Sequence, residues 1–269
     1  MIDGRALLEV AVEAAAIARD VVLSRAPGRL TAKGDRDYAT EVDYAVERKV
    51  RAYLAESTPS IGVLGEEEGG TGDRTAMQWV LDPVDGTVNF AHGVPLCGVS
   101  LGLVADRRPV LGVIDLPFLG TRYTAVAGEG AYRDGEPIQA SGTERLRDAV
   151  VTVGDYTVGV GAEAKNAVKL ALTARLARDA LRIRMLGSAA LDLAWLADGK
   201  TDGLIMLSNN PWDTAAGVII AREAGARVVD LDGSDHTLDS EATIAATPQV
   251  LPDLLALVRD AQAVPVDGA

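Results

Sequence analysis

With 269 residues, 48% of them hydrophobic, the chain is long enough to bury a large core, as one compact unit or as two closely packed halves. Its net charge of −13, without any Lys- or Arg-rich run, argues against nucleic acid or an anionic membrane surface as the partner. Because no apolar run reaches the ~18 residues of a membrane span and the N-terminus carries acids, we expect a cytoplasmic protein without a signal peptide.

Cysteine and histidine usage excludes several classes of site. The single cysteine, Cys97, cannot form an internal disulfide, and its apolar surroundings predict a buried, inert thiol. His92 and His236 are the two histidines, which excludes a zinc site built on several histidines and disfavours a Ser-His-Asp hydrolase. We expect both histidines in loops.

Two amphipathic helices are predicted in the first part of the chain. Apolar residues recur at three- and four-residue spacing over Leu7–Val22, before Pro27-Gly28. In the second helix Thr40 is the expected N-cap, Asp43 follows in the first turn, and an apolar stripe continues to Leu54.

Short strands follow, and two of them lead directly into acids. The strand Ile61–Gly65 precedes Glu66-Glu67-Glu68, and the strand Trp79–Leu81 precedes the segment Asp82–Thr87. Later strands and a hairpin at Asp134-Gly135 are typical of an antiparallel meander. These strands are Val99–Val104, Val110–Asp115 and Arg122–Val126.

Beyond Ser141-Gly142 strands and helices alternate, so we expect an N-terminal α+β subdomain over 1–141 and a C-terminal α/β subdomain over 142–269. The expected strands are Val150–Val153, Arg182–Met185, Gly203–Leu207, Arg227–Leu231 and Thr243–Ala246. The expected helices are Ala164–Leu176, Ser188–Ala197, Trp212–Ala224 and one that starts at Val250.

The segment Asp82–Thr87 carries the strongest chemical signal. Pro83 fixes its own φ and has no N–H, and Gly86 permits a close turn, so both aspartates and the Val84 carbonyl can face one point. Hard oxygen ligands of this kind suit Mg²⁺ or Mn²⁺. Taken alone, Asp85-Gly86 more commonly marks an ordinary turn, and Asp213 after Pro211 more commonly marks a helix cap.

Together, the motifs resemble those of the inositol monophosphatase family of Mg²⁺-dependent phosphatases, in the same order over most of the chain. They are Lys33, Ala39–Asp43, Gly65-Glu66-Glu67, Asp82–Phe90, Gly187–Ala190, Trp212–Gly217 and Glu223-Ala224-Gly225. The resemblance implies an α+β or α/β fold built as a layered α-β-α-β-α sandwich. It also implies a homodimer and lithium sensitivity.

The same resemblance implies a metal site of two or three Mg²⁺ ions, with Mn²⁺ as a possible substitute. The implied ligands are Glu66, Asp82, the carbonyl oxygen of Val84, Asp85 and Asp213. Carboxylates about 4 Å apart repel by roughly 4 kcal/mol per pair at an effective dielectric constant near 20, so such a cluster needs cations.

Catalytic and substrate-binding roles follow from the resemblance as well. Thr87 and Asp43 would orient and deprotonate the attacking water, with Glu66 at the same metal-activated water, and no covalent phosphoenzyme is needed. The implied substrate contacts are Asp85, Gly86, Thr87, Ser188, Ala189 and Asp213, with Glu67 and Lys33 as supporting residues. The backbone N–H groups around Gly86 and Thr87 would bind the phosphate.

The chain departs from the family at a position that is expected to contact the substrate. Met206 stands seven positions before Asp213, where inositol phosphatases carry a sugar-binding glutamate, and Asn209 or Asn210 are candidate replacements. We expect a small phosphorylated polyol, foremost myo-inositol 1-phosphate. The alternatives are histidinol phosphate, fructose 1,6-bisphosphate, nucleotide 3′-phosphates, or a regulatory role as a protein partner of the transcription or ribosome machinery.

Overall fold

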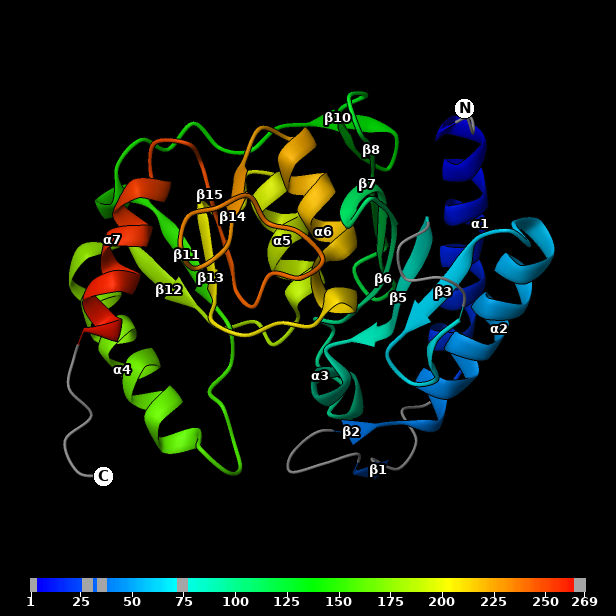
Figure 1. Ribbon diagram of the computed structural model, residues 1–269, viewed down its shortest axis with the longest axis horizontal. Helices are drawn as coiled ribbons and strands as arrows, with labels where there is room; N and C mark the ends of the chain where they lie inside the picture. Colours follow the sequence, from blue (N-terminus) through cyan, green and yellow to red (C-terminus); the bar gives the residue numbers. More distant parts are fainter. Residues whose placement is uncertain (1–3, 26–30, 33–37, 72–76, 264–269) are drawn as a thin grey trace.

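The computed structural model describes residues 4–25, 31–32, 38–71 and 77–263. Over these ranges the chain stacks five layers: a helix pair, a large sheet, a second helix pair, a smaller sheet and a third helix pair (Figure 1). The helices are α1 (Gly4–Ser24) and α2 (Glu41–Ser57), then α5 (Ala189–Ala197) and α6 (Pro211–Glu223), then α4 (Ala162–Asp179) and α7 (Leu251–Gln262). This arrangement confirms the predicted α-β-α-β-α sandwich.

The larger sheet has eight strands in the order β10-β9-β8-β7-β6-β5-β3-β4. Neighbouring strands from β5 to β10 pair antiparallel, whereas β3 and β5 pair parallel. The strands are β3 (Gly62–Gly65), β4 (Gly69–Gly70), β5 (Gln78–Asp85), β6 (Gly98–Ala105), β7 (Arg108–Leu116), β8 (Thr121–Val126), β9 (Ala131–Arg133) and β10 (Glu136–Ile138). A separate two-stranded sheet pairs β1 (Thr31–Ala32) with β2 (Tyr38–Ala39).

Strand β5 carries the acidic segment into the centre of the molecule. All eight of its residues are buried, and its pairing with β6 shifts register between Asp82 and Asp85. Such an irregularity re-aims side chains at the end of a strand. The chain then enters the short helix α3 (Thr87–Ala91) through Gly86, which has a left-handed φ of 86°.

The smaller sheet has five strands in the order β12-β11-β13-β15-β14. The strand β11 pairs parallel with both of its neighbours, and β15 pairs antiparallel with both of its own. The strands are β11 (Val150–Val153), β12 (Arg182–Arg184), β13 (Gly203–Met206), β14 (Arg227–Val229) and β15 (Thr243–Ala246), with a 3₁₀ turn η1 (Leu146–Asp148) before the sheet.

Helix α6 packs directly on the larger sheet because the strands beneath it carry glycine. A Cβ atom at Gly102 of β6 would lie 3.0 Å from the backbone nitrogen of Ala216, and one at Gly112 of β7 would lie 2.5 Å from the carbonyl oxygen of the same residue. The close approach fixes the height of α6, and of its first turn, above the sheet.

The predicted elements appear in the expected order, and most boundaries agree within two residues. The hairpin turn at Asp134 and Gly135 is confirmed, with φ of 51° and 86°. Strands β1, β2 and β4 and the turn η1 were not predicted. Lys33 lies outside the described residues, and the division into 1–141 and 142–269 stays a prediction. Across the described ranges, no helix has the length and apolar character to cross a bilayer.

Candidate active site

Asp43 and Thr87 meet at the start of helix α2. Thr40 caps this helix, and Asp43, which is fully buried, accepts the Thr40 backbone N–H at 2.9 Å through Oδ2. The other oxygen of Asp43, Oδ1, accepts the Thr87 hydroxyl at 3.2 Å. Burial raises the pKa of Asp43, and its hydrogen bonds lower it in part. The predicted hydroxyl–carboxylate pair is therefore assembled.

The segment after Asp82 folds back on itself through short hydrogen-bonded turns. The Val84 backbone N–H donates to Asp82 Oδ1 at 3.0 Å, and the Thr87 hydroxyl lies 3.1 Å from the Val84 carbonyl oxygen. A Cβ atom at Gly86 would lie 3.0 Å from the Leu96 carbonyl oxygen, so the turn has room for glycine alone. The hydroxyl of Thr87 therefore lies between the Val84 carbonyl oxygen and the Asp43 carboxylate.

Asp85 links this segment to helix α5. Its Oδ2 accepts the Ala190 N–H at 2.8 Å and the hydroxyl of the N-cap residue Ser188, and its Oδ1 accepts the Ala189 N–H at 3.2 Å. A carboxylate at this position is stabilised by the free N–H groups and the dipole of the helix. The predicted residues Asp85, Ser188 and Ala189 therefore lie together.

Asp213 sits in the first turn of α6. Its Oδ2 accepts the backbone N–H of Asn210 at 2.9 Å and the side-chain amide of the same residue at 3.2 Å, which forms a capping box. The cap interpretation of Asp213 is confirmed by these contacts, and it is compatible with a further role for Oδ1.

Glu66 lies in the turn between β3 and β4, and helix α2 holds this turn in place. The buried carboxylate of Glu47 accepts the backbone N–H groups of Glu67 and Glu68, each at 2.9 Å. Arg51, one turn further along α2, donates to Glu47 at 2.8 Å. Glu47 was not predicted as a site residue, although its position four residues after Asp43 places it on the same face of the predicted helix.

The acids of the site interact electrostatically. Burial raises the pKa of Asp82 well above its ordinary value, and the charges of Glu66, Asp85, Asp213 and Asp43 raise it further. Burial likewise raises the pKa of Asp213 to about 7, with contributions from Asp85 and Glu66. Burial raises the pKa of Asp85 to about 6. These carboxylates, drawn from β5, α2, α6 and the β3–β4 turn, share one region of the protein.

The donor chemistry of this region fits a divalent cation, because buried carboxylates that repel one another are stabilised by positive charge. Among the salt bridges of the described residues, none involves Asp43, Asp82, Asp85 or Asp213. Within those same ranges, no three His, Cys, Asp or Glu side chains are placed so that they could hold one ion together. The predicted ligand set therefore stays a prediction.

The proposed replacements for the sugar-binding glutamate are engaged elsewhere. Asn209 donates to the Ser240 carbonyl oxygen at 3.1 Å and accepts from Thr243 at 2.9 Å, and Asn210 binds Asp213. Both amides therefore build the loop before α6. Met206 instead lines a cavity beside the site.

Cys97 and the two histidines take no part in the site. Burial raises the pKa of the Cys97 thiol to about 12, which confirms a buried thiol that stays protonated. His92 caps the end of α3, and His236 lies in a loop, as predicted, but is only 2% exposed.

Asn89 connects the two halves of the site. Its side-chain amide donates to the carbonyl oxygens of Leu96 at 2.8 Å and Leu186 at 2.7 Å, which ties α3 to the chain just before α5. The sequence offered Asn89 only as part of the motif Asp82–Phe90, since its partners are distant along the chain.

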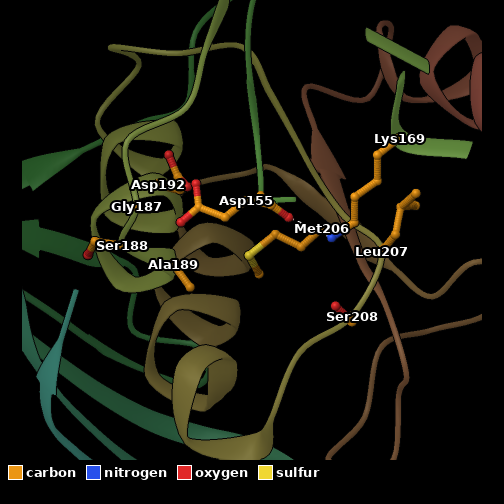
Figure 2. A pocket seen from close by; sticks show the side chains of 10 residues that line it. Asp155, Lys169, Gly187, Ser188, Ala189, Asp192, Met206, Leu207 and Ser208 are labelled. Carbon is orange, nitrogen blue, oxygen red and sulfur yellow. Dashed lines mark hydrogen bonds between the residues drawn. The ribbon is translucent and has the colours of Figure 1, made fainter. Parts of the chain in front are cut away.

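The cavity beside Ser188 has a volume of about 150 Å³. Figure 2 shows it between helix α5, which carries Ala189 and Asp192, and the chain that carries Met206 and Ser208. Because Ser188 binds Asp85, one end of the cavity adjoins the acidic region.

Comparison with known proteins identifies the family of the chain. The model of the inositol monophosphatase family matches residues 3–263. Inositol-1-monophosphatase ImpA of Mycolicibacterium smegmatis is 40% identical over 227 residues, which are 84% of this chain and 82% of that protein. Nus factor SuhB of Pasteurella multocida is 33% identical over 254 residues, covering 93% of this chain and 94% of that protein.

Among solved structures, the extragenic suppressor protein suhB of Bartonella henselae has a TM-score of 0.88 at 30% identity, and the match covers 94% of this chain and 98% of that one. The sequence motifs, the five-layer architecture and the family match agree over nearly the whole length. The chain therefore belongs to the inositol monophosphatase family and is a phosphatase.

Proposed function

We propose that the chain hydrolyses myo-inositol 1-phosphate to inositol and phosphate in a Mg²⁺-dependent reaction. The observation that carries the proposal is the contact of Thr87 with Asp43 beside the repelling acids Asp82, Asp85 and Asp213. A proton acceptor for water next to a binding region for cations is the arrangement that phosphate monoester hydrolysis requires. The name of the relative from Mycolicibacterium smegmatis supports this substrate.

The family uses divalent metals in general, Mg²⁺ among them. The residues that would hold two or three of these ions are Glu66, Asp82, the carbonyl oxygen of Val84, Asp85 and Asp213. When bound, the ions would supply positive charge to the phosphate oxygens and lower the pKa of water. Lithium sensitivity, typical of the family, is expected here too, and Mn²⁺ is an expected substitute.

The protein groups would act on the water and on the substrate. Asp43 would accept, through the Thr87 hydroxyl, the proton of the water that attacks phosphorus in line. The phosphorus–oxygen bond to the alcohol breaks, the alcohol oxygen takes up a proton from a solvent water as it leaves, and Asp43 then returns its own proton to solvent. Ser188 and Ala189 would face the alcohol, while Gly86 and Thr87 would contact the phosphate. Glu67 and Lys33 are proposed supporting residues, and the active unit is proposed to be a homodimer.

A panel of phosphate esters tests the proposal. Phosphate release is measured from inositol 1-phosphate, histidinol phosphate, fructose 1,6-bisphosphate and nucleotide 3′-phosphates, with Mg²⁺ and with a chelator. We expect the highest kcat/KM for inositol 1-phosphate and loss of activity in the chelator. A higher value for another ester would reassign the substrate within the same chemistry.

The variant Asp82→Asn tests the site itself. It removes a buried charge that its neighbours destabilise, so the protein should fold, while Mg²⁺-stimulated turnover should fall by at least about 100-fold. Asp179→Asn, a change of the same kind at an exposed acid of α4, is the control and should keep full activity. If Asp82→Asn has the circular dichroism spectrum of the wild type and unchanged turnover, the proposed site is ruled out.

A second function, as a protein partner of the transcription machinery, is supported by the relative named Nus factor SuhB. It predicts that purified RNA polymerase elongation complexes bind the wild-type chain and the inactive Asp82→Asn chain equally well. Lack of binding by both chains would reject it.

A further inference from the structure

We propose that Asp192 recognises a hydroxyl group of the departing alcohol, so that the cavity beside Ser188 selects polyol phosphates over phosphates of simple alcohols. The inference rests on the proposed phosphatase function and adds a specificity residue on α5. Asp192 lies outside the sequence motifs that resemble those of the family.

Asp192 is a buried acid with an unused oxygen. The residue is only 2% exposed, and its Oδ1 has no hydrogen-bond partner in the described part of the chain. Leaving a buried polar atom without a partner is unfavourable, so such atoms commonly mark the place of a ligand or an ordered water. The side chain lines the cavity, in which Figure 2 shows it beside Asp155.

The other residues that line the cavity are less suited than Asp192 to bind a hydroxyl group of the alcohol. The thioether of Met206 is a weak acceptor and donates nothing. The ammonium group of Lys169 already donates to the Asp155 carbonyl oxygen at 2.5 Å and to Thr157 at 3.0 Å. Asp155 and Ser208 are both exposed, so water reaches both.

The position of the cavity matches that of a leaving group. At one end Ser188 is hydrogen-bonded to Asp85, so an ester held near Asp85 would extend its alcohol along α5 toward Asp192. A volume of about 150 Å³ leaves space for more than a single water molecule beside Asp192.

The protonation of Asp192 also suits a hydroxyl partner. Burial raises its pKa well above the ordinary value, with further contributions from Asp85 and Asp155 and a partly opposing hydrogen bond with Thr152. A neutral carboxyl group both donates and accepts, as does a hydroxyl, whereas a carboxylate only accepts.

The test compares two esters with the same ring, inositol 1-phosphate and cyclohexyl phosphate, which lacks the hydroxyls. The measured quantity is the ratio of their kcat/KM values with Mg²⁺. In Asp192→Leu the ratio should fall about fivefold to tenfold, the value of one lost hydrogen bond. Asp192→Asn keeps a group of the same shape that donates and accepts, and should recover most of the ratio.

A matched control is Asp202→Asn, because Asp202 is also a buried acid but binds Ser141 and the Val150 N–H away from the cavity. This variant should change the kcat/KM values of both esters by the same factor, so that their ratio stays as in wild type. An equal ratio in wild type and Asp192→Leu, or a wild-type ratio near one, would overturn the inference while leaving the phosphatase intact. Absence of wild-type turnover on both esters would instead reject the proposed function. If Asp192→Leu does not fold, Asp192→Ser replaces it, with the same expected fall in the ratio.

Discussion

Asp213 illustrates how one side chain combines a structural and a chemical role. It caps α6 through Oδ2, and burial together with neighbouring negative charges raises its pKa from 3.8 to about 7. Between these two values the folded chain binds a proton that the unfolded chain has released. Because the folded state then binds more protons, this group makes stability fall as the pH rises through that interval.

The variant Asp213→Asn should therefore gain stability relative to wild type as the pH increases from about 4 to about 7, and the difference should level off above that. The replacement of the capping carboxyl group by an amide adds an offset that does not depend on pH. Denaturant unfolding in a chelator, repeated across this range, measures the difference. Added Mg²⁺ at pH 8 should stabilise the wild type more than the variant. A difference that is flat with pH would contradict the prediction.

Helix α2 is the element that aligns the two catalytic regions. Asp43 and Glu47 lie one turn apart on it, the first in contact with Thr87 and the second with the turn that carries Glu66. A Cβ atom at Gly65 would lie 2.2 Å from the Glu47 carboxylate, so the strand before the turn is shaped around this side chain. One rigid helix thereby sets the distance between Thr87 and the turn that carries Glu66.

Glu47→Gln should loosen this alignment, since an amide can accept only one of the two N–H groups well and places its own N–H₂ against the other. We expect the Mg²⁺ concentration for half-maximal activity to rise about tenfold, with a smaller effect on kcat at saturating Mg²⁺. Hydrogen exchange of the Glu67 and Glu68 amides should also become faster. Arg48→Gln removes only an exposed ion pair with Glu68 and serves as the control, with less than about twofold change. Equal effects of the two variants would show that Glu47 has no special role.

Local sequence signals accounted for most elements but not for the contacts between them. The cap at Thr40 and the turn at Asp134-Gly135 were predictable because the residues that decide them are adjacent in sequence. Strand β4 and the pair β1–β2 have only two residues per strand, too few for a periodic pattern.

The residues of the candidate site were identified by resemblance, and their partners could not be predicted. Asp85 binds Ala190, which is 105 residues away along the chain, and Asn209 binds Thr243, which is 34 residues away. Such contacts depend on how the layers stack, information that no local pattern contains. The distances of the acids to a common ion are likewise absent from the sequence.

At the scale of the whole molecule, the spacing of the layers determines where Asp213 lies. In Gly112→Ala the new methyl group would meet the Ala216 carbonyl oxygen at 2.5 Å, so α6 must move away from the sheet. We expect a loss of about 2–3 kcal/mol in the free energy of unfolding and a higher Mg²⁺ requirement, because Asp213 moves with the helix. Gly70→Ala is the control, as its methyl group meets only Leu64 at 3.4 Å. Urea unfolding that gives equal losses for both variants would contradict the prediction.

The outer strands of both sheets have a consequence for self-association. The large sheet ends at β4, which has only two residues, and at β10, in which Pro137 cannot donate to a neighbour. The small sheet ends at β12, with the exposed arginines 182 and 184, and at β14, with exposed Arg227. An incoming strand from another molecule would meet a very short strand, a missing donor or an exposed positive charge at each of these borders, and these are the features by which proteins discourage fibril-like growth.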